Sequence, residues 1–110
     1  MEVARIARLA RNRRFLARVF TADEVKYCRG KKNAAQHFAV RFAAKEAVWK
    51  ALNEHTRVRG ISHREISVGR AASGQPVVEL SKRLKEFEPR ISLSLSHTKD
   101  FALAVALLSN

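Results

Sequence analysis

The sequence predicts an α+β fold in which helices, one of them long and buried, precede a small antiparallel sheet that ends in a β-hairpin. Three observations lead to this prediction. Apolar residues recur at helical spacing up to about residue 53, the period becomes that of strands after residue 60, and turn signals separate the later segments. A chain of 110 residues with 46% apolar residues suits one folded domain, which we expect to span residues 1–110.

The first half of the chain carries signals for three helices. Apolar residues recur at helical spacing through segment 1–20, which predicts a first, arginine-rich helix. Thr21 followed by Glu24 has the pattern of a capping box, which predicts the start of a second, short helix. Asn33 is a suitable N-cap for a third helix, the longest, which we expect to reach about Asn53.

The second half of the chain reads as strands. Ile61–Val68 and Val77–Leu80 are predicted strands, and Ser73–Pro76 is the turn before the second of them. Ile91–Ser96 alternates apolar residues with serine, and the apolar run Phe101–Leu108 follows after a four-residue loop. This arrangement predicts a β-hairpin.

The third helix is apolar almost all round, which is typical of a central, buried helix. One side of it is rich in alanine, so a neighbouring element can approach closely. The predicted hairpin offers two sets of small residues, each on one face of a strand: Ser92, Ser94 and Ser96, then Ala102, Ala104 and Ala106. We expect the alanine side of the helix to pack on these small faces.

The charge balance indicates a polyanionic partner. The net charge is +12, from 22 Lys and Arg residues against 10 Asp and Glu residues. Nucleic acid, an anionic membrane, an acidic protein and a phosphate-rich ligand all remain possible partners on this evidence. The single cysteine, Cys28, excludes an internal disulfide and suits a reducing compartment, so we expect a cytoplasmic protein. No apolar run approaches the about 20 residues that a membrane span needs.

Among the charged residues of the apolar third helix, Lys45 and Glu46 stand out. Consecutive helical residues point about 100° apart, so each needs its own partner. Buried charges are costly unless they are paired or bind a metal. One interpretation is that Lys45 extends to solvent while Glu46 pairs with an arginine; the other is a metal or phosphate site.

Several motifs, in order along nearly the whole chain, resemble holo-[acyl-carrier-protein] synthases of the 4′-phosphopantetheinyl transferase superfamily. The segment Arg41–Ala47, RFAAKEA, resembles the family's signature segment. The other matching positions are Glu2, Arg5 and Ile6 at the start, Phe20, Thr21, Glu24, Tyr27 and Cys28 before the third helix, the turn Gly74–Pro76, and the Ser-Leu-Ser-His-Thr segment Ser94–Thr98.

The resemblance implies a phosphopantetheinyl transferase. Members move the 4′-phosphopantetheine group of coenzyme A onto a serine of an acyl carrier protein and release adenosine 3′,5′-bisphosphate. It implies that Glu46 is a ligand of Mg²⁺, a hard cation that prefers oxygen. Lys45 would either bind the pyrophosphate as a compact cation or accept the serine proton, and the sequence leaves both roles open. Glu46 and Lys45 are therefore the predicted catalytic residues.

The resemblance also implies the remaining binding residues. It places Arg41 and His97 near the nucleotide phosphates, and the backbone around Ser94 and Ser96 beside the ligand. Family members receive the acidic carrier protein on a basic first helix, to which Arg5 corresponds and which Arg8 extends. They form trimers with active sites between subunits, so we expect a homotrimer that serves fatty acid biosynthesis.

One family motif is incomplete. The family opens with a strand reading Gly-x-Asp-x-Val-Glu, whose aspartate is the other protein ligand of Mg²⁺. Met1 stands at the valine position, so the glycine and the aspartate would precede residue 1. Either the natural chain starts upstream or the protein lacks this ligand and its strand. The intact later motifs favour an upstream start.

Two other functions stay open. A small basic nucleic-acid-binding module would explain the charge and the arginine-rich start. Against it, only eight aromatic residues occur, several inside the helical core, and the four histidines and Cys28 lack the spacing of a zinc site. The second is an inactive homologue that binds a carrier protein without modifying it.

Overall fold

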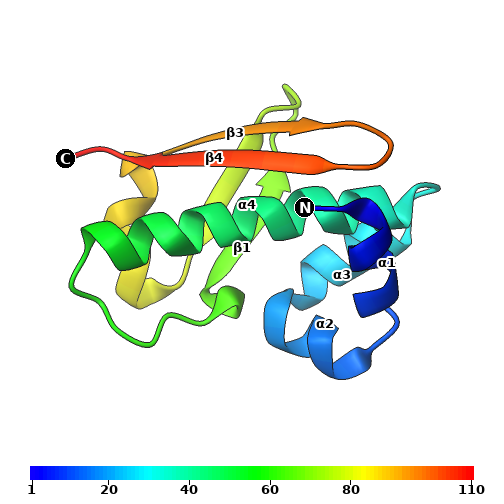
Figure 1. Cartoon of the computed structure of the whole chain (residues 1–110). Coiled ribbons are helices and arrows are strands. Elements are labelled where there is room, and N and C mark those ends of the chain that lie inside the picture. The colour runs from blue at the N-terminus through cyan, green and yellow to red at the C-terminus, as the bar shows by residue number, and fades with distance from the viewer.

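The computed structural model describes all residues from 1 to 110, and it confirms the predicted α+β class. Helices occupy the first half of the chain and strands the second (Figure 1). The elements in chain order are α1 (Val3–Leu9), α2 (Arg13–Val19), α3 (Ala22–Arg29), α4 (Ala34–His55), the 3-10 helix η1 (His63–Glu65), β1 (Ile66–Arg70), β2 (Pro76–Leu80), the 3-10 helix η2 (Lys82–Arg90), β3 (Ile91–His97) and β4 (Ala102–Leu108).

The segment predicted as one N-terminal helix is two helices, α1 and α2. The break lies at Asn12, whose side-chain oxygen accepts hydrogen bonds from the backbone nitrogens of Arg14 at 2.9 Å and Phe15 at 3.3 Å. An asparagine in this position caps a new helix, and local capping competes with continuation of the preceding one. Periodicity alone did not reveal this cap.

The capping box predicted for α3 is confirmed. The Thr21 hydroxyl accepts from the Glu24 backbone nitrogen at 3.3 Å, and the Glu24 carboxylate accepts from the Thr21 backbone nitrogen at 2.8 Å. The long helix α4 begins after Asn33, as predicted, although the Asn33 side chain makes no capping hydrogen bond. The helix ends at His55, two residues later than expected.

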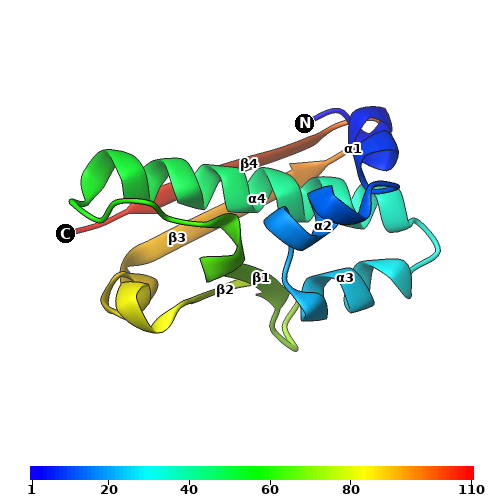
Figure 2. The ribbon, with the colours of Figure 1, turned by 90° about the horizontal axis from the view of Figure 1, so that it is seen from below.

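Helix α4 runs through the centre of the molecule. The β3–β4 hairpin lies along one side of it, and α1, α2 and α3 gather around its N-terminal half (Figures 1 and 2). One buried core cluster joins α1, α2 and α3 to this half, and a second joins β1, β2 and η2 to the C-terminal half. The predicted burial of the helix is therefore confirmed. No helix of the chain combines the length and the apolar character that a membrane crossing requires.

The strands form two separate antiparallel pairs, β1 with β2 and β3 with β4, rather than the one small sheet predicted. The first strand starts at Ile66 instead of Ile61. The reason is the short helix η1, which Ser62 and Glu65 cap reciprocally: the Ser62 hydroxyl accepts from the Arg64 nitrogen, and Glu65 accepts from the Ser62 nitrogen at 3.0 Å. This turn removes residues 61–65 from the strand.

The expected packing of the hairpin on α4 is half right. Ala102 is buried, and Ala104 and Ala106 pack into the core beside α4, as predicted. The serine face is exposed instead of packed. The register explains this: Leu93 pairs with Ala106 and Leu95 with Ala104, and directly paired residues share a face. Because the leucines and alanines face inward together, the serines must face outward.

The N-terminus extends the hairpin edge. The Met1 ammonium donates to the Ala102 carbonyl at 2.7 Å, and the Val3 nitrogen donates to the Asp100 carbonyl at 2.8 Å. Glu2 forms an isolated antiparallel bridge with Phe101. These contacts hold the start of α1 beside β4 and bring its first turn next to α4.

Candidate active site

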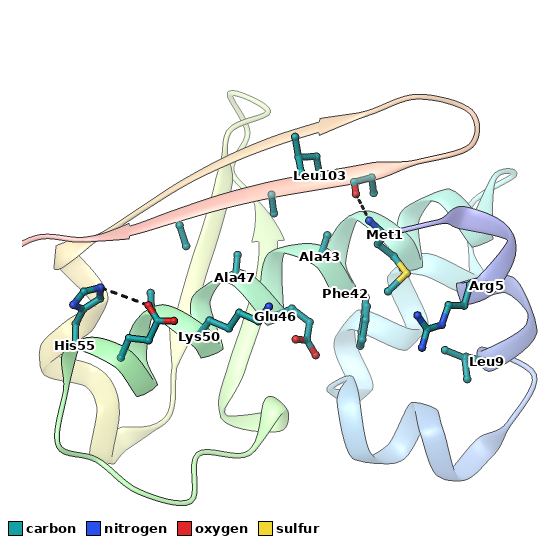
Figure 3. A pocket seen from close by; sticks show the side chains of 15 residues that line it. Met1, Arg5, Leu9, Phe42, Ala43, Glu46, Ala47, Lys50, His55 and Leu103 are labelled. Carbon is teal, nitrogen blue, oxygen red and sulfur yellow. Dashed lines mark hydrogen bonds and ion pairs between the residues drawn. The ribbon is translucent and has the colours of Figure 1, made fainter.

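A groove of about 640 Å³ lies between α1, α4 and β4 (Figure 3). Alanines of α4 and β4 form much of its floor, and its charged lining residues include Arg5, Glu46 and Lys50. Figure 3 shows Arg5 reaching in from α1, with Phe42 between it and the Glu46 carboxylate in this view. We call this concavity the α4 groove. It brings together two of the predicted site residues, Arg5 and Glu46.

Glu46 carries one of the two carboxylates that line the α4 groove, and Glu54 carries the other. Its side chain is 35% exposed, and its Oε1 lies 3.1 Å from Nε2 of His63. Its other oxygen, Oε2, has no hydrogen-bond partner in the protein. The alternative that Glu46 merely pairs with an arginine is therefore wrong, and one carboxylate oxygen is free to bind a ligand.

Lys45 is not among the residues that line the groove, and its role at the substrate phosphates stays a prediction. Its ammonium is fully buried, and its Nζ lies 2.5 Å from Oε1 of Glu24. Burial lowers the pKa of the Lys45 ammonium, and the Glu24 carboxylate opposes that shift. Glu24 also accepts from the backbone nitrogens of Thr21 and Val68, each at 2.8 Å. The pair therefore joins α3, α4 and β1, and this geometry supports a structural role for Lys45.

Sequence reasoning overlooked Lys50. It follows Glu46 by four residues, and this spacing puts both side chains on the same face of α4. The structure places Lys50 in the lining of the α4 groove with an exposed side chain. The i,i+4 relation to Glu46 was the available signal. Lys50 supplies the cation that Lys45 does not supply there.

Arg41 belongs to a second group of charges near the N-terminal half of α4. It is buried, with 3% of its surface exposed, and its guanidinium carbon lies 4.2 Å from the centroid of the Tyr27 ring. Lys31 approaches the same ring at 4.6 Å, and His37 packs edge-on against it at 5.7 Å. No carboxylate forms an ion pair with Arg41, Lys31 or His37.

Several positive charges act on the imidazole of His37. Burial lowers the pKa of its imidazole most, and the positive charges of Arg41, Lys31, Arg70 and His97 lower this pKa further. We call Lys31, Arg41, Arg70 and His97, together with the His37 on which they act, the cationic cluster; the lowered pKa favours a neutral His37 imidazole, so the charge of the cluster comes from the other members. Like charges repel unless an anion stands between them, so the cluster is suited to a ligand with several phosphate charges.

The remaining predicted residues are exposed. Ser94 and Ser96 lie on the outer face of β3, and Arg8 lies on the surface of α1. Within one chain the predicted site therefore divides into the α4 groove, which contains Arg5 and Glu46, and the cationic cluster, which contains Arg41 and His97.

Residues 1–106 match the family model described as the 4′-phosphopantetheinyl transferase superfamily. The chain belongs to this superfamily. A holo-[acyl-carrier-protein] synthase of Koribacter versatilis is 37% identical over 117 residues, with 100% of this chain and 93% of the relative covered. The resemblance seen in the sequence motifs is thereby confirmed.

Solved structures of the family share the fold. The holo-[acyl-carrier-protein] synthase of Neisseria meningitidis superposes with a TM-score of 0.84 at 31% identity, covering 100% of this chain and 93% of that one. The holo-(acyl-carrier-protein) synthase of Bacillus anthracis, solved in complex with CoA (3′,5′-ADP), superposes with a TM-score of 0.77 at 32% identity and covers 100% and 91%. The superfamily fold thus extends over the entire chain.

Proposed function

We propose that this chain transfers the 4′-phosphopantetheine group of coenzyme A to a serine of an apo acyl carrier protein. Family membership supports the reaction class. The observation that carries the proposal for this chain is the Glu46 carboxylate: it lies in the α4 groove, on the segment that resembles the family signature, with one oxygen unpaired. The proposed products are holo acyl carrier protein, for fatty acid biosynthesis, and adenosine 3′,5′-bisphosphate.

The residues of the α4 groove fit a Mg²⁺ ion. Mg²⁺ prefers oxygen ligands and is commonly held by one or two carboxylates together with substrate phosphates and water. Glu46 offers an unpaired carboxylate oxygen that is partly exposed and therefore accessible. When bound, the ion would neutralise charge that develops on the phosphate oxygens. Glu46 is the residue of this chain that would hold it.

Transfer forms a bond between the carrier serine oxygen and the β-phosphorus of coenzyme A, and it breaks the bond from that phosphorus to the oxygen bridging the two phosphates. The serine hydroxyl releases its proton, and the leaving group departs as adenosine 3′,5′-bisphosphate. Chemistry of this kind depends on positioning and on charge neutralisation. Lys50 and Arg5 supply positive charge in the α4 groove, and Arg41 supplies it in the cationic cluster, which also contains His97.

The carrier protein would dock on α1. Arg5, Arg8 and Arg11 lie on the exposed surface of this short helix and the turn after it. An acidic partner would be drawn to this surface by charge complementarity, and mutation of such surface charges mainly changes the association rate. The cytoplasm is the proposed site of the reaction, which the reduced, buried Cys28 suits.

The proposed enzyme is a homotrimer whose subunits meet through the outer face of the β3–β4 hairpin. Leu103, Val105 and Leu107 project from that face and are 65%, 53% and 66% exposed. Water-exposed apolar patches of this kind commonly mark protein interfaces. A shared interface would also explain the divided site, since the α4 groove of one subunit could lie beside the cationic cluster of its neighbour.

A direct assay tests the proposed reaction. The chain is incubated with coenzyme A, Mg²⁺ and an apo acyl carrier protein, and the carrier is then weighed by mass spectrometry. We expect a mass gain equal to one phosphopantetheine group, and no gain with Glu46→Gln at unchanged thermal stability. If Glu46→Gln retains full Mg²⁺-dependent transfer, the proposed role of this carboxylate is wrong.

A further inference from the structure

Only one oxygen of the Glu46 carboxylate has a hydrogen-bond partner in the protein. Nε2 of His63 lies 3.1 Å from its Oε1. An ionised carboxylate can only accept hydrogen bonds, so Nε2 must carry the hydrogen and donate it. Because this bond occupies Oε1, the carboxylate has a preferred orientation while its Oε2 stays unpaired.

His63 is itself fixed in place. Its ring stacks on Trp49 with centroids 5.3 Å apart and planes 17° from parallel. The Trp49 indole is anchored in turn, because its Nε1 donates to the Ile61 carbonyl at 2.8 Å. The backbone of His63 lies in η1, which Ser62 and Glu65 cap reciprocally. Both the ring and the main chain of His63 are therefore ordered before any ligand arrives.

Nothing in the core explains why a histidine should occupy this position. Its side chain is 21% exposed, and Trp49 offers it a flat apolar surface on which any aromatic ring could stack. The feature that only histidine adds is the N–H group aimed at Glu46. This N–H group acts on the Glu46 carboxylate and is not needed for packing against the helix.

We propose that His63 is a positioning residue, which orients the Glu46 carboxylate so that Oε2 is presented to a divalent cation. This inference rests on the proposed function, in which Glu46 holds that cation. Hydrogen bonds from a second layer of residues orient metal ligands, and their loss typically costs about 10- to 100-fold in metal affinity or activity. The ordered Trp49–His63 stack supplies such a bond from a rigid support.

Two substitutions separate the hydrogen bond from the stacking. His63→Phe keeps a ring on Trp49 and removes the donor, whereas His63→Gln keeps an N–H donor and removes the stacking ring. Each full-length variant is titrated with Mn²⁺ in the presence of coenzyme A, and free Mn²⁺ is followed by electron paramagnetic resonance. This measurement requires no turnover. Thermal unfolding without metal reports whether the fold is kept.

We expect His63→Phe to weaken Mn²⁺ binding about tenfold at an unchanged melting temperature, and His63→Gln to restore most of the affinity. In transfer assays the loss in His63→Phe should appear as a higher Mg²⁺ requirement, with the maximal rate at saturating Mg²⁺ largely kept. If His63→Phe binds Mn²⁺ as tightly as the unmodified chain, or if His63→Gln is equally defective, His63 does not position Glu46.

A third variant shows whether a negative result overturns only the role of His63 or the proposed cation site as a whole. Glu46→Gln should abolish Mn²⁺ binding if Glu46 is the cation ligand. If Glu46→Gln binds Mn²⁺ normally, the proposed cation site is wrong, and the inference about His63 falls with it. If Glu46→Gln loses binding while His63→Phe does not, only the inference about His63 is overturned.

Discussion

Replacing Lys45 with methionine tests whether this lysine supports the structure or the reaction. Lys45→Met keeps the length of the side chain and removes the ammonium that lies 2.5 Å from Glu24. The Glu24 carboxylate, with 2% of its side chain exposed, then stays buried without its counter-ion. Breaking a buried ion pair from one side costs about 3–5 kcal/mol.

The contacts of Glu24 indicate that the loss of stability lies at the lower end of that range. Glu24 still accepts hydrogen bonds from the backbone nitrogens of Thr21 and Val68, each at 2.8 Å, and these bonds partly compensate its charge. We therefore expect Lys45→Met to lower the free energy of unfolding by about 3 kcal/mol. Urea unfolding followed by circular dichroism measures this change, and the slope with urea shows whether both states stay comparable.

Two further variants serve as controls. Lys50→Met removes an exposed lysine from the same helix and should change the unfolding free energy by less than about 0.5 kcal/mol, while it slows phosphopantetheine transfer. Glu24→Gln combined with Lys45→Met removes both buried charges and should recover part of the lost stability. If Lys45→Met is as stable as the unmodified chain but inactive, the structural role assigned to Lys45 is refuted.

Three more predictions concern packing, assembly and pH. Ala104→Leu should lower stability by about 1–3 kcal/mol in thermal unfolding, because Ala104 faces α4. Ser94→Leu, on the outer face, should leave the monomer fold intact. Equal tolerance at both sites would contradict the assigned hairpin faces. Leu107→Glu should shift the chain from trimer to monomer in light scattering, and an unchanged mass would exclude this face as the interface. Hydrogen bonds from Arg83 lower the pKa of the Glu65 carboxyl from 4.5 to about 2. Since the folded pKa is the lower one, this carboxylate stabilises the fold above pH 4.5 and its contribution disappears as the pH falls toward 2. The stability difference between the unmodified chain and Glu65→Gln should shrink over that range in urea unfolding, and a constant difference would contradict the assignment.

Local spacing allowed much of the fold to be predicted. The Thr21–Glu24 capping box follows from residues three positions apart and is present. Helix α4 also starts after Asn33 as predicted, but without the side-chain cap on which that prediction was based. The helix break at Asn12 was missed, because the apolar stripe continues across it and a single side-chain cap decides the matter. The 3-10 turn from Ser62 to Glu65 was missed for the same kind of reason.

The site was predictable in part. Helical geometry required separate partners for Lys45 and Glu46, and the structure shows two, Glu24 and His63. The identity of those partners was not predictable, since Glu24 lies 21 residues from Lys45 and His63 lies 17 residues from Glu46. Helix α3 covers the side of α4 that carries Lys45, so Lys45 is buried and Lys50 is the lysine that lines the groove. The sequence does not show which side of α4 is covered.

By itself, the sequence determined the fold class, most of the elements, the alternation of the hairpin, the anomaly of Lys45 and Glu46 in an apolar helix and the family that the motifs resemble. Only the tertiary structure decided that the serines of β3 face outward, that Lys45 is buried and that Glu46 opens into a groove. The physical reason is that backbone hydrogen bonding and capping act over a few residues, whereas the surroundings of a side chain are made by segments that are distant in the chain.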